Sequence, residues 1–348
     1  MNPYVLMVLL SSLGLGTTLT FASSHWLLAW MGLEINTLAI VPLMAQHHHP
    51  RAVEATTKYF LTQATAAAMI LFASTTNAWI TGEWDMNSMS NPIANTMIIT
   101  ALALKIGLAP MHFWMPEVLQ GLDLLTGLIL STWQKLAPLA LIIQTAQAID
   151  PLLLMALGLM STLVGGWGGL NQTQLRKILA YSSIAHMGWM IIVLQYARQL
   201  TLLALLMYIL MTSAAFLTLK TLSATKVSTL AVVWSKSPAL TASTALVLLS
   251  LGGLPPLTGF MPKWLILQEL TKQDLPLTAT IMALAALLSL YFYLRLCYAM
   301  TLTISPNTAT ASTPWRIQTT QASLPLALFT TVALGLLPVS PTILMLVT

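Results

Sequence analysis

Residues 107–117 read GLAPMHFWMPE and residues 253–263 read GLPPLTGFMPK, so the chain contains nearly the same helix-breaking stretch twice. Aligned without a gap, the two share Gly, Leu, Pro, Met and Pro, and each ends on a charged residue. Proline lacks an amide donor and clashes with the preceding turn, so Pro110 and Pro256 are expected to interrupt helices and to leave carbonyl groups unpaired. A membrane tolerates such backbone only beside protein, polar side chains or water.

The composition is typical of an integral membrane protein. Of 348 residues, 57% are hydrophobic and 7% are charged, whereas a soluble domain carries roughly 25% charged residues. The net charge of +5 indicates basic loops on one side of a membrane rather than nucleic-acid binding. The single cysteine, Cys297, argues against a disulfide framework, a cysteine-ligated iron–sulfur cluster and a thiolate zinc site. We therefore expect one integral domain over residues 1–348, with no cofactor or metal of its own.

Apolar stretches predict about eleven transmembrane helices. The N-terminal stretch MNPYVLMVLL lacks the features of a signal or transit peptide and is expected to begin the first span directly. If the helices alternate in direction, most basic residues fall on the N-terminal side, which the positive-inside rule assigns to the cytoplasm or its organellar equivalent. These residues are Arg51, Lys58, Arg176, Lys177, Lys220, Lys226, Lys236 and Arg316. The predicted spans are 3–21, 25–45, 56–80, 92–121, 122–147, 149–171, 174–195, 199–222, 238–271, 274–300 and 322–346.

The two repeated stretches belong to the fourth and ninth predicted spans. An odd separation means that these spans cross the membrane in opposite directions, as in an inverted-topology repeat whose broken helices line an ion path. The alternative is that proline and glycine are simply common kinks in membrane helices. A matched pair at an odd separation favours the repeat.

Four charged residues lie inside predicted spans: Glu34, Lys105, Lys135 and Lys263. A charge at the bilayer centre costs roughly 2.5–3.5 kcal/mol, so a polar interior axis is the expected setting for all four. Burial favours the neutral form of a lysine and a nearby carboxylate favours the charged form, so a lysine under both influences can carry a proton. Glu34 is the expected partner of Lys105. The alternative is a static buried ion pair with the other lysines reaching the headgroups, although Lys135 lies roughly 18 Å from each end of its span.

Weaker candidates accompany these charges. His112 lies inside the first break and His186 near the middle of the seventh span; either can relay a proton or be a neutral, hydrogen-bonded core residue. Glu117 takes the place of Lys263 in the first stretch, as a gate or as a solvated group. The run His47-His48-His49 is predicted to be a loop rather than a metal site, because adjacent positions on a helix point in different directions.

The stretches WMGLEINTLAIVPLM, LKIGLAPMHFWMPEVLQGL, STWQKLAPL, KILAYSSIAHMGWM and SLGGLPPLTGFMPKWLILQEL together resemble the NADH dehydrogenase subunit 2 family, in the form found in vertebrates such as fish. Members are mitochondrially encoded membrane subunits of respiratory complex I and are similar to bacterial Na⁺/H⁺ antiporter subunits. The resemblance covers essentially the whole chain. It implies an all-α, polytopic, antiporter-like fold in the mitochondrial inner membrane, with the N-terminus in the matrix and the C-terminus in the intermembrane space.

The resemblance also implies a proton-translocating subunit of NADH:ubiquinone oxidoreductase. In it Glu34 pairs with Lys105, Lys135 is the central proton site, and Lys263 leads outward. NADH, FMN, iron–sulfur clusters and ubiquinone are then bound by other subunits. The expected partners are other membrane subunits, accessory subunits and the lipid bilayer, including cardiolipin. Two rival functions stay open: an independent Na⁺/H⁺ exchanger, and a structural subunit that moves no protons.

Overall fold

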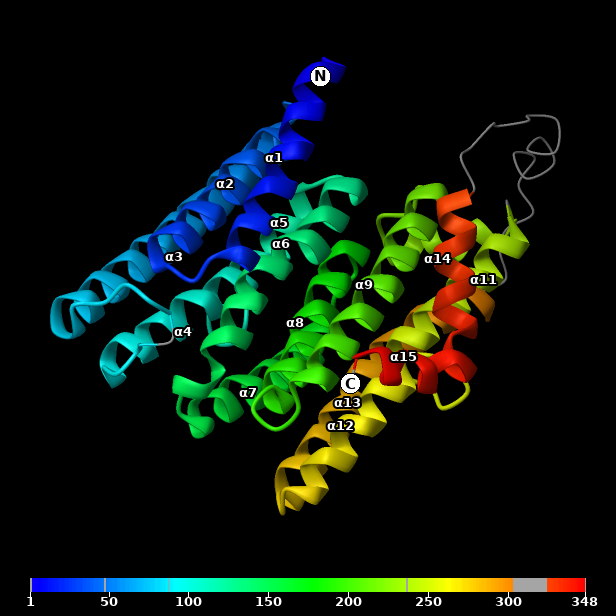
Figure 1. Cartoon of the computed structure of the whole chain (residues 1–348). Helices are drawn as coiled ribbons and strands as arrows, with labels where there is room; N and C mark the ends of the chain where they lie inside the picture. The colour runs from blue at the N-terminus through cyan, green and yellow to red at the C-terminus, as the bar shows by residue number, and fades with distance from the viewer. Residues whose placement is uncertain (1, 47, 87, 236, 303–323, 348) are drawn as a thin grey trace. The chain divides into compact units, whose positions relative to one another are not determined.

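The computed structural model describes residues 2–46, 48–86, 88–235, 237–302 and 324–347. All the secondary-structure elements named in that part of the chain are helices (Figure 1). Helices satisfy their own backbone hydrogen bonds, which a lipid environment requires. Proline begins many of them, because the first helical position needs no amide donor and suits the fixed φ of proline. Helices that start in this way are α1 (Pro3–Ala22), α3 (Pro50–Thr81), α4 (Pro92–Ile106), α7 (Pro151–Gly169), α11 (Pro238–Gly252) and α13 (Pro276–Thr301).

The chain folds as two units, Met1–Ser161 and Thr162–Thr348. In the first unit α3 packs against both α4 and α5, and α6 packs against α1, α2 and α4. The two halves of the first broken helix therefore share a helical neighbour. Besides α1, α3, α4 and the start of α7, this unit contains α2 (Trp26–Met44), α5 (Trp114–Gly121), α6 (Leu124–Thr145) and the short η1 (Ala146–Ala148).

The second unit repeats that packing around its own broken helix. Here α9 packs against both α11 and α12, and α13 does the same. The remaining elements are α8 (Leu175–Val193), α9 (Arg198–Thr221), α10 (Val227–Val232), η2 (Val233–Ser235), α12 (Phe260–Lys272), α14 (Leu324–Gly335), η5 (Leu337–Val339) and α15 (Ser340–Val347).

Both predicted breaks are confirmed, and both begin at a glycine. The helices α4 and α11 have 15 residues each and are followed by Gly107 and Gly253, each with φ of 84°. Each glycine amide donates to two carbonyls of the preceding turn. Glycine adopts this left-handed conformation without the penalty of a Cβ, so it ends the helix three residues before the proline. Each second half begins at the same position of the repeat, Trp114 in α5 and Phe260 in α12.

The predicted spans agree with the helices within a few residues, except at the start of the third span and inside the last one. The short α10 and η2 lie between two predicted spans, where a loop is expected. The third helix begins earlier than predicted, at Pro50. The last predicted span, 322–346, is divided into α14 and α15 with η5 between them. Pro338 and Pro341 lack the amide donors that a continuous helix would need there.

Six helices in the described part of the chain are long and apolar enough to cross a membrane. They include α1, α2, α7, α9 and α13, together with α6 extended through η1; α4, α11 and α14 are shorter apolar helices. Eleven crossings stays a prediction. The predicted loop residues His47, Lys236 and Arg316 lie outside the described residues.

Candidate functional site

Glu34 lies on α2, one turn before Thr37. The hydroxyl of Thr37 donates to Glu34 Oε2 at 3.2 Å, and Glu34 Oε1 is buried without a hydrogen-bond partner in the described part of the chain. The carboxylate acts electrostatically on Lys105 and on Tyr59. Glu34 is therefore a neighbour of Lys105, and no hydrogen bond joins the two side chains within the described residues.

Lys105 lies in the last turn of α4, just before the glycine that ends the helix. Its side chain is only 5% exposed, and its Nζ has no hydrogen-bond partner among the described residues. The carbonyl end of a helix carries a partial negative charge, which favours a cation in this turn. The break thus creates an electrostatically favourable place for the ammonium without binding it directly.

Lys135 lies near the middle of α6 and is 2% exposed. Pro138 follows within the same helix, so the carbonyl of Gln134 lacks the amide donor that a residue at position 138 would usually supply. The side chain of Gln134 in turn donates to the backbone carbonyl of Asn36 on α2 at 3.3 Å. This stretch of α6 therefore offers polar backbone next to a buried lysine.

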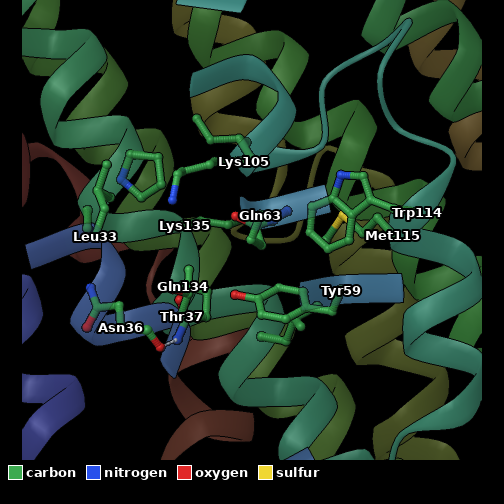
Figure 2. A pocket seen from close by; sticks show the side chains of 14 residues that line it. Leu33, Asn36, Thr37, Tyr59, Gln63, Lys105, Trp114, Met115, Gln134 and Lys135 are labelled. Carbon is green, nitrogen blue, oxygen red and sulfur yellow. Dashed lines mark hydrogen bonds between the residues drawn. The ribbon is translucent and has the colours of Figure 1, made fainter. Parts of the chain in front are cut away.

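Lys105 and Lys135 line the same cavity in the first unit, which we call the lysine cavity (Figure 2). Its volume of about 10 Å³ is at the lower limit of the roughly 10–15 Å³ that one water molecule needs. Its walls come from α2, α3, α4, α5 and α6, and the hydroxyl of Tyr59 points toward Thr37 and Gln134 in this view. The polar residues of the lining are Asn36, Thr37, Tyr59, Gln63, Lys105, Gln134 and Lys135.

Lys263 belongs to the second unit and lies in the first turn of α12. It is 9% exposed, and its Nζ donates to the carbonyl of Gly252, the last residue of α11, at 2.8 Å. A Cβ on Gly253 would lie 2.9 Å from that Nζ, so the glycine leaves room for the amine. Each break thus carries a lysine at the carbonyl end of its first half-helix, one before the glycine (Lys105) and one after it.

The two histidines lie in different surroundings. His112 is buried in the first break, with Nδ1 3.2 Å from the carbonyl oxygen of Pro110 and its ring 4.4 Å from that of Phe113. His186 lies on α8, with its ring 5.6 Å from that of the buried Tyr208 on α9. Either environment is compatible with a relay or with a core histidine.

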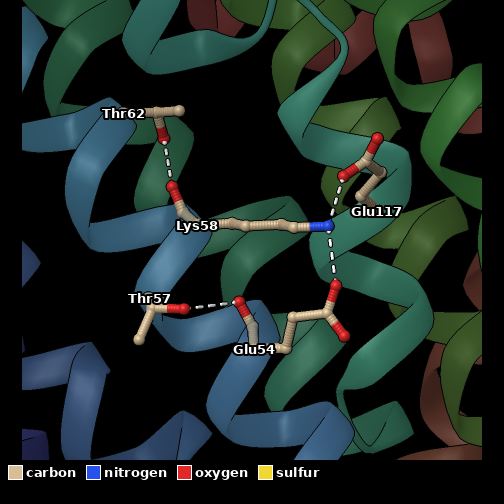
Figure 3. Close-up of polar contacts among 5 residues, drawn as sticks. All are labelled: Glu54, Thr57, Lys58, Thr62 and Glu117. Carbon is tan, nitrogen blue, oxygen red and sulfur yellow. Dashed lines mark hydrogen bonds and ion pairs between the residues drawn. The ribbon is translucent and has the colours of Figure 1, made fainter.

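Glu117 is a surface residue of α5. Its carboxylate accepts from Lys58 Nζ at 2.8 Å, and the same amine lies 2.8 Å from Glu54 Oε1 (Figure 3). The side chains of Lys58 and Glu117 are 44% and 53% exposed. Exposed ion pairs contribute about 0–1 kcal/mol. The contact therefore joins α3 to α5 at the surface and is unlike the buried contact of Lys263.

His48, His49 and Arg295 have contacts that do not suggest a further site. His49 caps α3, with its Nδ1 accepting from the amide of Arg51 at 3.2 Å, and His48 lies in the preceding turn. Arg295 donates to the carbonyl of Leu170. Within the described residues, no group of three or more His, Cys, Asp or Glu side chains could hold a metal ion.

Sequence reasoning missed several residues of the lysine cavity: Tyr59, Gln63, Gln134, Asn36 and Thr37. They are uncharged, so none of them carries the large membrane penalty that drew attention to the lysines. The available signal was spacing along the helix: Gln63 follows Tyr59 by one turn on α3, and Asn36 and Thr37 follow Glu34 closely on α2.

Family models cover nearly the whole chain. Residues 23–289 match the model described as NADH:quinone oxidoreductase/Mrp antiporter, TM, and residues 290–344 match NADH dehydrogenase subunit 2 C-terminus. Relatives named NADH-ubiquinone oxidoreductase chain 2 are 86% identical in Carassius auratus and 78% identical in Danio rerio, over 100% of this chain and of each relative.

Solved structures agree with these matches. A chain of respiratory complex I from Thermus thermophilus with bound aureothin superposes with a TM-score of 0.87 at 28% identity, covering 99% of this chain and 80% of that one. A chain of the Mrp complex from Dietzia sp. reaches a TM-score of 0.85 at 14% identity, covering 97% and 76%, and shares the fold. The resemblance inferred from the motifs is confirmed, and the chain belongs to the NADH:quinone oxidoreductase/Mrp antiporter membrane family, with a C-terminal part of the NADH dehydrogenase subunit 2 type.

Proposed function

We propose that this chain is a proton-translocating membrane subunit of NADH:ubiquinone oxidoreductase, respiratory complex I. The observation that carries the proposal is the lysine cavity, where two lysines that are 5% and 2% exposed lie within a helical membrane protein. Relatives at 86% identity bear the name of that oxidoreductase, which supports the same assignment. A purely structural subunit would gain nothing from buried ammonium groups, because apolar residues would be cheaper there.

Electrostatic coupling between the charged groups supplies the mechanism. Glu34 acts on Lys105, and Lys105 shares the lysine cavity with Lys135. At an effective dielectric constant of 20, two unit charges interact by roughly 4 kcal/mol at about 4 Å and by roughly 2 kcal/mol at about 8 Å. The smaller of these energies corresponds to a change of about thirtyfold in proton affinity. A change of charge near Glu34 would therefore pass to Lys105 and then alter how tightly Lys135 holds its proton.

The proposed direction of transfer is the one that the family resemblance implies. Protons load Lys105 and Lys135 from the matrix and leave to the intermembrane space by way of Lys263, with His112 and His186 as relays. Quinone reduction in other subunits, which bind NADH, FMN, iron–sulfur clusters and ubiquinone, drives the cycle. The chain lies in the mitochondrial inner membrane with its N-terminus in the matrix, in contact with other core subunits, accessory subunits and lipids such as cardiolipin.

The test is Lys135→Met in the assembled complex. The substitution keeps an unbranched side chain and removes the proton carrier, so the ratio of protons moved to electrons transferred is expected to fall sharply. Lys220→Met, at an exposed position in the last turn of α9, is the matched control and should leave the ratio unchanged. A normal ratio in Lys135→Met would refute the role of this lysine.

A second measurement separates the proposal from an independent exchanger. The purified chain alone in liposomes is expected to show no exchange of Na⁺ for H⁺, because the driving reaction lies in other subunits. Sodium-dependent proton exchange by the isolated chain would replace the proposal with a secondary transporter.

A further inference from the structure

Polar groups without a protein partner converge on the lysine cavity. They are Lys105 Nζ and Gln63 Nε2, which have no hydrogen-bond partner in the described part of the chain. The two side chains are 5% and 3% exposed. Each lines the cavity, and they come from two different helices, α4 and α3. The amide of Asn36 is also without a partner there, but its tip lies against Gly16 of α1 rather than toward these two groups.

Buried donors and acceptors of this kind need a partner. A polar group that loses water and gains no hydrogen bond keeps most of its desolvation cost, and native proteins satisfy such groups with ordered water. The lysine cavity, at about 10 Å³, has room for about one water molecule. Groups from several walls supply the two to four polar contacts that a buried water makes.

We propose that Gln63 is a positioning residue that holds an ordered water in the lysine cavity, between Lys105 and Lys135. A glutamine amide both donates and accepts, so it can bond the water whichever way the hydrogens of the water point. The side chain of Gln63 is not ionisable, so it can hold the water without taking up the proton itself. This role rests on the proposed function: the water is the link through which a proton passes between the two lysines.

The position of Gln63 fits this role. It lies on α3, one turn after Tyr59, and both residues face the lysine cavity. The helix α3 packs against α4, the helix that carries Lys105. A rigid helix next to the one that carries the unpartnered amine is a suitable place for a group that must hold a water in one position.

The first test is a high-resolution map of the unmodified assembled complex. We expect density for a water within hydrogen-bond distance of both Lys105 Nζ and the amide of Gln63. A cavity filled by protein atoms, with the Gln63 amide bonded only to protein groups, would overturn the proposal. This measurement needs no variant and decides the matter even if a substitution prevents assembly.

The second test compares Gln63→Met with Gln63→Asn. Methionine keeps the length and apolar packing of the side chain and cannot bond the water, so coupled NADH:ubiquinone turnover should fall by up to roughly tenfold, the factor at the upper end of the usual range for one lost neutral hydrogen bond. Asparagine keeps the amide and leaves space for a further water, so it should recover most of the turnover. A residue important only for packing predicts the opposite order, because asparagine loses volume and methionine does not.

Asn77→Leu is the matched control. Asn77 is a buried amide on the same helix, 1% exposed and without a partner in the described part of the chain, and it does not line the lysine cavity. Turnover per assembled complex should stay normal. If Gln63→Met turns over normally while Lys135→Met loses pumping, the role of Gln63 is wrong and the proposed function stands; if both pump normally, both proposals fail.

Discussion

Single residues differ in how their buried charge is held. Lys263 donates to a helix-terminal carbonyl, whereas Lys105 lies at the equivalent end of its own half-helix with no hydrogen bond among the described residues. A carbonyl partner stabilises the charged amine, while an amine without a fixed partner is freer to change its bonds. The contrast fits a path in which Lys105 exchanges contacts and Lys263 has one defined resting contact.

Gly253→Ala tests the contact of Lys263. At φ of 84° a Cβ costs about 1–2 kcal/mol, and here it would also lie 2.9 Å from Lys263 Nζ and displace the amine. We expect lower thermal stability of the assembled complex and lower coupled turnover. Gly14→Ala in α1 is the control, because nothing lies within 4 Å of its Cβ position and the change favours helix. Equal melting temperatures for the two variants would contradict this reading.

At the scale of elements, two half-helices of equal length end in the same glycine cap. What differs is how the second half is attached to its neighbours. In the first unit α5 is joined to α3 by an exposed ion pair of Glu117, while the residue at the equivalent position of α12, Lys263, is buried against α11. The same position of the repeat is therefore exposed in the first unit, as Glu117, and buried in the second, as Lys263.

Glu117→Gln decides between a gate and a solvated group. An exposed pair contributes about 0–1 kcal/mol, and the pair of Lys58 with Glu54 stays in place after the substitution. We expect coupled turnover within twofold of normal and an unchanged melting temperature. A loss of pumping as large as that of Lys135→Met would place Glu117 on the proton path instead.

At the scale of the whole molecule, the candidate residues are divided between two units. Glu34, Lys105, Lys135 and His112 belong to the first unit, and His186 and Lys263 to the second. If one path uses both, removal of either end should block the same process. Groups that act as a unit show strongly non-additive effects.

A pair of substitutions tests this. Lys105→Met and Lys263→Met should each lower coupled turnover, and the double variant should be no slower than the slower single variant. Turnover measured with all three complexes, normalised to assembled complex, gives the comparison. If the fold-loss of turnover in the double variant equals the product of the two single fold-losses, the two units transfer protons independently.

Much of this arrangement is predictable from particular residues. The glycine–proline stretches predict both breaks, and the charges inside spans predict that Lys105, Lys135 and Lys263 are buried. The division of the last helix was missed, although Pro338 and Pro341 signal it. The carbonyl partner of Lys263 could not be predicted, because it depends on how the chain returns after the break.

The sequence by itself determined the helical membrane class, the places where two helices break and the identity of the buried charges. These are local properties, because hydropathy, proline geometry and the cost of a charge in lipid act within one segment. Only the tertiary structure decided that Lys105 and Lys135 share a cavity and that Gln63 lines it. That cavity exists because five helices pack around it. Contacts between residues far apart in the chain cannot be predicted from the hydrophobic pattern of a single helix, because they depend on how the side chains of several helices pack together.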